Sequence, residues 1–122
     1  MAFSELFQDW QDIEDVAPGS VIFSERDPAD VLYFILEGEV ELSLNGRSLV
    51  TEKNGAIIGE MAMVESAVRN ATATALTAAR LARIDREQLK ALISGNVDFS
   101  LHMMAQLANR LRVVDQFLTR PR

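Results

Sequence analysis

Short apolar runs separated by tight-turn residues fill the first two thirds of the chain, and this pattern indicates a mainly β domain. Val40, Leu42 and Leu44 alternate with polar residues, as in a strand with one solvent-facing side. Asn45-Gly46 follows directly, and this dipeptide is the strongest short signal for a β-hairpin. The apolar run 31–36 predicts a strand buried on both faces, although periodicity alone also allows a helical segment. The expected strands are 21–23, 31–36, 40–44, 47–52, 71–76 and 81–84, and a second tight turn at Asn54-Gly55 leads into Ile57-Ile58.

After residue 84 the apolar positions take on a helical period. Asp85 is the expected N-cap of a first helix, because Gln88 three residues later completes a variant of the capping box. Gly95 ends this helix, and Asn96 begins a second one that runs to about Leu118. The residues expected to be buried on the first helix are Leu89, Leu92 and Ile93. Strands followed by two helices predict an antiparallel β-roll (a jelly roll) with C-terminal helices.

The second helix is apolar around much of its circumference. At 100° per residue its apolar positions cover roughly 240°, whereas a one-sided surface helix needs only about 100°. We therefore expect one face to pack on the roll and the other on a second copy of the chain. Alternatively, the first helix covers the extra face, or the N-terminal segment does. The positions are Leu101, Met103, Met104, Ala105, Leu107, Ala108, Leu111, Val114, Phe117 and Leu118.

The N-terminal segment is expected to form one or two helical turns over residues 4–10. Its apolar residues share helical spacing and predict packing against the roll or a partner. They are Phe3, Leu6, Phe7 and Trp10.

Composition narrows the class of protein. The 122 residues suit one domain, and the net charge of −6 disfavours nucleic acid binding, which needs a basic face. Cysteine is absent and His102 is the only histidine, so we expect no thiolate or multi-histidine metal site. A metal-dependent jelly-roll enzyme is disfavoured on the same ground. No apolar run reaches membrane-spanning length and the start lacks a basic signal region, so we expect a cytoplasmic protein.

Gly59-Glu60 and Arg69 form a candidate anion site. Free backbone N–H groups at a helix start favour a phosphate, and glycine allows the close approach of a ligand. Arg69 can supply two parallel hydrogen bonds to phosphate oxygens. Glu60 repels phosphate but accepts from a hydroxyl, so the combination suggests a nucleotide with its ribose. The alternative is an ordinary helix start followed by a solvated arginine.

The longer motif resembles the phosphate-binding cassette of cyclic nucleotide-binding domains. It is Gly59-Glu60-Met61-Ala62-Met63, then five residues, then Arg69-Asn70-Ala71-Thr72. The resemblance extends from about Val16 to about Arg112 and implies the β-roll of this family. Further matching segments are Pro18-Gly19-Ser20-Val21-Ile22-Phe23, Asp27-Pro28-Ala29-Asp30, Leu32-Tyr33-Phe34-Ile35-Leu36-Glu37-Gly38-Glu39-Val40 and Leu81-Ala82-Arg83-Ile84-Asp85.

The resemblance implies a role for each residue of the cassette. Arg69 pairs with the exocyclic phosphate oxygens, and Glu60 accepts from the ribose 2′-hydroxyl. Asn70 stands where a hydroxyl residue can favour cyclic GMP, so the choice between cyclic AMP and cyclic GMP stays open. Val114 and Asp115 would lie near the base. The implied ligand-binding set is Gly59, Glu60, Met61, Ala62, Arg69, Asn70 and Ala71.

Three positions depart from the family pattern. Ile58 stands where phenylalanine often precedes Gly-Glu, and Val68 stands where proline or a small polar residue is common. Arg26 replaces a glycine that many members carry in the turn before Asp27. We therefore expect the phosphate and ribose contacts to transfer more directly than the base contacts.

The implied organisation is a single domain, 1–122, that stands alone without a DNA-binding domain. It divides into a lead-in (1–15), a roll (16–84) with its cassette (59–72), and C-terminal helices (85–119). We expect a non-enzymatic sensor that binds cyclic AMP or cyclic GMP and no other cofactor. It would act as a homodimer through the last helix, or on an effector protein in trans, without nucleic acid or membrane. The alternatives are the sensor part of a transcription regulator and a degenerate domain that only binds proteins.

Overall fold

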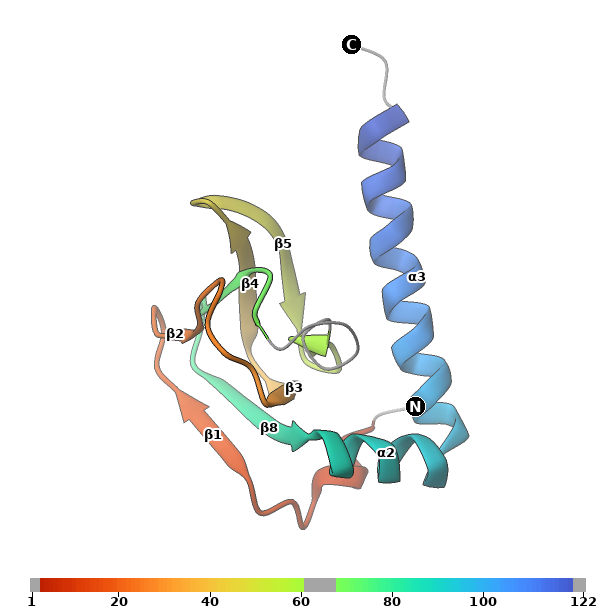
Figure 1. Cartoon of the computed structure of the whole chain (residues 1–122). Helices are drawn as coiled ribbons and strands as arrows, with labels where there is room; N and C mark the ends of the chain where they lie inside the picture. The colour runs from red at the N-terminus through yellow and green to blue at the C-terminus, as the bar shows by residue number, and fades with distance from the viewer. Residues whose placement is uncertain (1–2, 61–67, 120–122) are drawn as a thin grey trace.

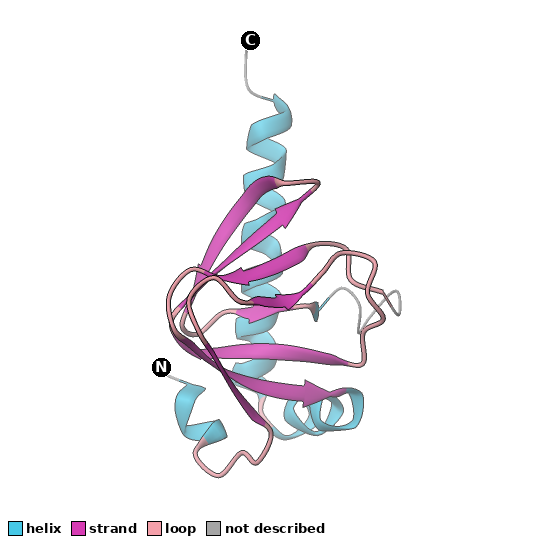
Figure 2. Ribbon diagram, turned by 90° about the vertical axis from the view of Figure 1, so that its left-hand side faces the viewer, coloured by secondary structure: helices cyan, strands magenta, loops and turns pink. Residues whose placement is uncertain are grey.

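Two antiparallel sheets of four strands each form the body of the described chain (Figures 1 and 2). The computed structural model describes residues 3–60 and 68–119, without the side chains of Ser4 and residues 113–119. The strand orders are β1-β8-β3-β6 and β2-β7-β4-β5. The elements are η1 (Phe3–Phe7), β1 (Ile13–Val16), β2 (Val21–Phe23), β3 (Val31–Glu37), β4 (Glu39–Leu44), β5 (Arg47–Lys53), β6 (Ile57–Ile58), β7 (Thr72–Ala75), β8 (Ala79–Asp85), α2 (Arg86–Gly95) and α3 (Val97–Thr119). The mainly β roll with two C-terminal helices is confirmed.

Strand β3 separates two apolar cores. Tyr33 and Ile35 point into the core between the two sheets. Leu32 and Phe34 point the other way, into the core shared with the helices. Burial on both faces explains the unbroken apolar run, because every side chain of such a strand contacts other side chains. The helical alternative for this run is wrong.

The β4–β5 hairpin turns at Asn45-Gly46, as predicted. Their φ angles are +52° and +79°, and a two-residue type I′ turn requires positive φ at both positions. Leu44 pairs with Arg47 directly across the turn. The turn is therefore set by local chemistry that the sequence shows.

Two boundaries and one burial prediction differ from the structure. Strand β8 begins at Ala79, two residues before the predicted start, and β1 begins at Ile13, inside the segment assigned to the lead-in. These two strands pair with each other, Ile13 opposite Ala82 and Val16 opposite Ala79, so each extends the other. Ile93 was expected to be buried but is 44% exposed. On helix α2, Leu92 and Ile93 flank Leu89 on opposite sides, and only Leu92 packs against the core that buries Leu89.

Both helices begin where predicted, and both starts are capped. Asp85 accepts from the Gln88 backbone N–H at 2.8 Å, and the Gln88 side chain accepts from the Asp85 backbone N–H at 2.9 Å. The Asn96 side chain accepts from the Phe99 N–H at 2.9 Å and caps α3. Helix α3 then stands beside the roll, with Phe99 and Met103 buried against it (Figure 1).

The N-terminal aromatic cluster packs on the roll and on α3. Phe7 stacks on Phe34 with ring centroids 4.6 Å apart, and the Trp10 indole donates to the Arg83 carbonyl at 2.8 Å. Phe3 contacts the rings of Phe99 and His102 at 6.0 and 4.8 Å. The predicted packing against the roll is confirmed.

Within the residues that the structure describes, no helix combines the length and the apolar character needed to cross a membrane.

Candidate functional site

The fold brings Gly59 and Arg69 into contact. Arg69 Nη1 donates to the Gly59 carbonyl at 3.3 Å. Gly59 has φ +80°, and a Cβ atom there would lie 2.5 Å from Arg69 Nη1. Glycine is therefore favoured by the left-handed backbone, and a Cβ atom would also displace the end of the Arg69 side chain. The two residues of the candidate anion site therefore lie side by side.

The Arg69 side chain is 5% exposed and lies inside the roll. Its guanidinium carbon is 4.3 Å from the centre of the Phe23 ring and 5.7 Å from that of Tyr33. Its Nε has no hydrogen-bond partner among the described residues. Burial lowers the pKa of Arg69, and Tyr33, Asp30 and Asp27 partly oppose this. An arginine keeps its charge even so, and the buried cation can bind an anion.

The loop before β3 fixes the backbone of Arg69. The Arg69 N–H donates to the Asp27 carbonyl at 2.8 Å, and the Arg26 N–H donates to the Arg69 carbonyl at 2.7 Å. Arg26 itself has φ +74°, a left-handed conformation that glycine adopts without strain. Arg26, which replaces the glycine of many family members, thus adopts the backbone conformation of that glycine.

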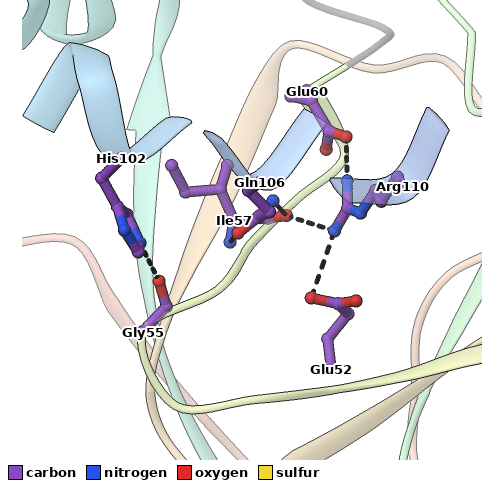
Figure 3. Close-up of polar contacts among 7 residues, drawn as sticks. All are labelled: Glu52, Gly55, Ile57, Glu60, His102, Gln106 and Arg110. Atoms are coloured by element: carbon purple, nitrogen blue, oxygen red, sulfur yellow. Dashed lines mark hydrogen bonds and ion pairs between the residues drawn. The ribbon is translucent and has the colours of Figure 1, made fainter. Parts of the chain in front are cut away.

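Glu60 of the cassette is ion-paired with helix α3. The residue is 4% exposed, and its carboxylate pairs with Arg110 Nη1 (Figure 3). Arg110 Nη2 donates to the Ile57 carbonyl at 2.8 Å and lies 3.4 Å from a Glu52 oxygen. Arg110 thereby joins the helix, the edge strand β6 and both carboxylates.

Two further side chains of α3 hold the backbone that leads into the cassette. Gln106 donates to the Ile57 carbonyl and accepts from the Ile57 N–H, both at 2.7 Å, in the manner of a neighbouring strand. His102 Nε2 donates to the Gly55 carbonyl at 2.6 Å (Figure 3). We call His102, Gln106 and Arg110 the polar stripe, because a spacing of four residues places them on one helix face.

The polar stripe was not predicted from the sequence. Three polar side chains recur in steps of four in this helix, at 102, 106 and 110. Polar residues also stand elsewhere in it, at 98, 109 and 112 for example, so spacing alone does not reveal which face meets the roll.

The other predicted site residues are placed as follows. Asn70 is exposed and Ala71 is buried, both directly after Arg69. Met61 and Ala62 lie outside the described residues. Val114 and Asp115 fall within α3, but their side chains also lie outside the description. The base contacts therefore stay a prediction.

The site offers ligand recognition through charge and hydrogen bonding. Arg69 presents a buried cation, and Glu60 presents a buried acceptor one residue from Gly59. Across residues 3–60 and 68–119, no group of three or more His, Cys, Asp or Glu side chains could hold a metal ion.

Comparison with known proteins identifies the same region. The model of the family described as "Cyclic nucleotide-binding domain" matches residues 13–96. A cAMP-dependent protein kinase regulatory subunit from Schizosaccharomyces pombe is 35% identical over 81 residues, which are 66% of this chain and 20% of that protein. A CRP-like cAMP-activated global transcriptional regulator from Mycobacterium tuberculosis is 30% identical over 103 residues, 80% of this chain and 46% of that protein. The chain thus spans less than half the length of these curated relatives.

A similar fold occurs in the crystal structure of the Thermus thermophilus catabolite activator protein. The TM-score is 0.78 at 29% sequence identity, and the match covers 94% of this chain and 56% of that one. The match of the family model covers well over half of the chain and includes Gly59, Glu60 and Arg69. This chain therefore belongs to the family of cyclic nucleotide-binding domains.

Proposed function

We propose that this chain is a sensor that binds cyclic AMP or cyclic GMP at the cassette and reports binding through α3. One observation carries the proposal: Arg110 of α3 is ion-paired with Glu60 of the cassette. A ligand hydroxyl that donates to Glu60 would meet the same carboxylate that holds the helix. Occupancy of the site and the position of α3 are then linked.

The phosphate would bind at Arg69. Its guanidinium is buried, charged and in contact with Gly59, where a side chain would clash. The ribose would bind at Glu60, adjacent in sequence. A ligand changes the equilibrium between two helix positions only by the difference between its affinities for them. The contact at Glu60 supplies such a difference, because Arg110 and the ligand use one carboxylate.

Calorimetric titration with cyclic AMP and with cyclic GMP tests the binding site. Replacing Arg69 with alanine removes one side of a buried charged contact, which costs about 2–5 kcal/mol, or roughly 30- to 5,000-fold in affinity. Arg80→Ala is the matched control, because Arg80 is an exposed arginine on β8 whose ion pair with Asp15 is long, at 3.9 Å. Failure of the wild-type chain to bind either nucleotide at millimolar concentration would refute the proposal.

Hydrogen exchange with and without nucleotide tests whether ligand binding is transmitted to α3. In the wild-type chain we expect saturating nucleotide to change protection at Ile57 and along α3. In Arg110→Gln, which lacks the charge, the change in α3 should shrink while binding persists. Identical changes in both proteins would show that the ion pair does not carry the signal.

We further propose that the chain pairs with a second copy through the outer face of α3. The polar stripe faces the roll, whereas Met104 and Leu111 are 57% and 71% exposed. The exposed positions alternate in steps of four and three, the spacing of a two-helix seam. The N-terminal segment contacts Phe99 and His102 and does not bury this face. The face consists of Val97, Leu101, Met104, Ala108 and Leu111.

Sedimentation of the wild-type chain and of Met104→Glu tests the dimer. We expect a dimer that the glutamate converts to a monomer, while Asn109→Glu, an exposed substitution beside the seam, leaves it intact. A wild-type monomer at all concentrations would contradict the pairing without affecting the ligand site.

The proposed activity is binding without turnover. Incubation with cyclic AMP or cyclic GMP and Mg²⁺ should return the nucleotide unchanged. Detectable formation of the open monophosphate would assign an enzyme instead.

A further inference from the structure

The buried guanidinium of Arg69 lies against two aromatic faces. Phe23 and Tyr33 stack on each other, with centroids 5.9 Å apart and planes 22° from parallel. Both lie within about 6 Å of the guanidinium, the range in which a cation is attracted to a ring face. Among the described residues, Arg69 forms no ion pair with a carboxylate.

The two rings come from different sheets and meet inside the roll. Phe23 ends β2 of one sheet, and Tyr33 lies in β3 of the other. Both are buried, so neither ring turns away without opening the core between the sheets. Phe23 Cε2 would also be 3.5 Å from a Cβ at Gly59. Ring, glycine and guanidinium therefore form one packed unit.

An aromatic face stabilises a cation from above the plane of the guanidinium, so the N–H groups in that plane stay available. A carboxylate partner would instead accept two of these N–H groups at once. Here Nη1 donates to the Gly59 carbonyl, and Nε has no partner among the described residues. The Nε atoms of Arg83 and Arg110 also lack such partners, but both of those arginines are ion-paired with carboxylates. Among these three arginines only Arg69 has no carboxylate of the described residues on its N–H fork, and the oxygens of a ligand can take that place.

We propose that Phe23, supported by Tyr33, is a positioning residue that holds Arg69 in place for the phosphate of the ligand. The inference rests on the proposed function and adds a residue outside the cassette to the site. Because the guanidinium is oriented before the ligand arrives, less conformational freedom is lost on binding.

Nucleotide affinity of three variants tests this role. Phe23→Leu removes the ring face and should weaken binding about 2- to 30-fold, the range that a cation–ring contact represents. Phe23→Tyr keeps the ring and should bind within about twofold of the wild type. Phe34→Leu is the matched control, since it is a buried phenylalanine of the other core and does not contact Arg69.

A double-mutant comparison separates positioning from general damage to the fold. In an Arg69→Ala background, Phe23→Leu should cause no further loss of affinity, because its effect acts through Arg69. An equal loss in both backgrounds, or an equal loss in Phe34→Leu, would overturn the inference.

An NMR measurement on the ligand-free protein keeps the test independent of folding defects in the variants. The Arg69 Hε resonance of the wild-type chain should be shifted upfield by the ring of Phe23. An unshifted resonance, or Phe23→Leu binding as tightly as the wild type, would overturn this inference alone. A wild-type chain that binds neither nucleotide would overturn the proposed function together with it.

Discussion

Arg69 and Arg110 are two arginines brought to the same short stretch, Gly59-Glu60, and their surroundings differ sharply. Arg69 lies against two aromatic rings and forms no ion pair with a carboxylate among the described residues. Arg110 is paired with the carboxylates of Glu52 and Glu60 and with a backbone carbonyl. The comparison suggests a division of roles. An arginine engaged by carboxylates holds structure together, whereas one held by ring faces keeps hydrogen-bonding capacity for a ligand.

The largest effect on stability is expected from Arg110→Met. The substitution leaves two largely buried carboxylates without their cation, and breaking a buried pair from one side costs about 3–5 kcal/mol. Urea denaturation at fixed protein concentration measures the loss. Arg112→Met, an exposed arginine on the same helix, should change the free energy of unfolding little. Similar values for the two variants would show that Arg110 is not structural.

Arg69→Met should affect nucleotide binding more than stability, the opposite of Arg110→Met. Stability should fall by less than about 2 kcal/mol, because only ring contacts and one long hydrogen bond are lost. Nucleotide binding should nevertheless be largely lost. Parallel denaturation and calorimetry of the two methionine variants test this division. It fails if Arg69→Met unfolds the domain as readily as Arg110→Met.

Gly59→Ala should destabilise by about 1–2 kcal/mol, since alanine is strained at positive φ and its Cβ displaces the end of Arg69. Gly46→Ala is a matched control, because Gly46 has φ +79° but nothing within 4 Å of a Cβ. The difference between the two variants in thermal unfolding isolates the contact with Arg69. No difference would mean that the guanidinium moves aside freely.

The smallest expected effect is a gain in stability. Arg26→Gly should raise the free energy of unfolding by about 0.5–1 kcal/mol, because glycine relieves the left-handed strain at Arg26 but costs chain entropy. Asn45→Gly should gain less, since asparagine tolerates this conformation. Urea denaturation ranks the two. A loss of stability in Arg26→Gly would indicate that the arginine side chain holds the turn.

Elements that depend on neighbours in sequence were predicted well. The hairpin at Asn45-Gly46 and the capping box at Asp85 each need only a few adjacent residues. The alternating and unbroken apolar runs indicated which strands have one buried face and which have two. The resemblance to the cassette also placed Gly59, Glu60 and Arg69 in one candidate site.

Elements that depend on distant partners were missed. Strand β1 forms because Ile13–Val16 lies against β8, and four residues with two charges do not indicate a strand on their own. The polar stripe was missed for the same reason, because its partners lie about fifty residues earlier in the chain.

The sequence by itself determined the β-roll of the cyclic nucleotide-binding family and the long last helix, and it indicated a candidate anion site at Gly59 and Arg69. Only the tertiary structure decided how that helix is oriented. Gln106 and Arg110 face the roll because the edge of β6 and the carboxylates of Glu52 and Glu60 need hydrogen-bond partners. Apolar side chains cannot satisfy them, so Met104 and Leu111 face outward. A buried polar group without a partner costs more than an exposed apolar one, and this difference sets the rotation of α3.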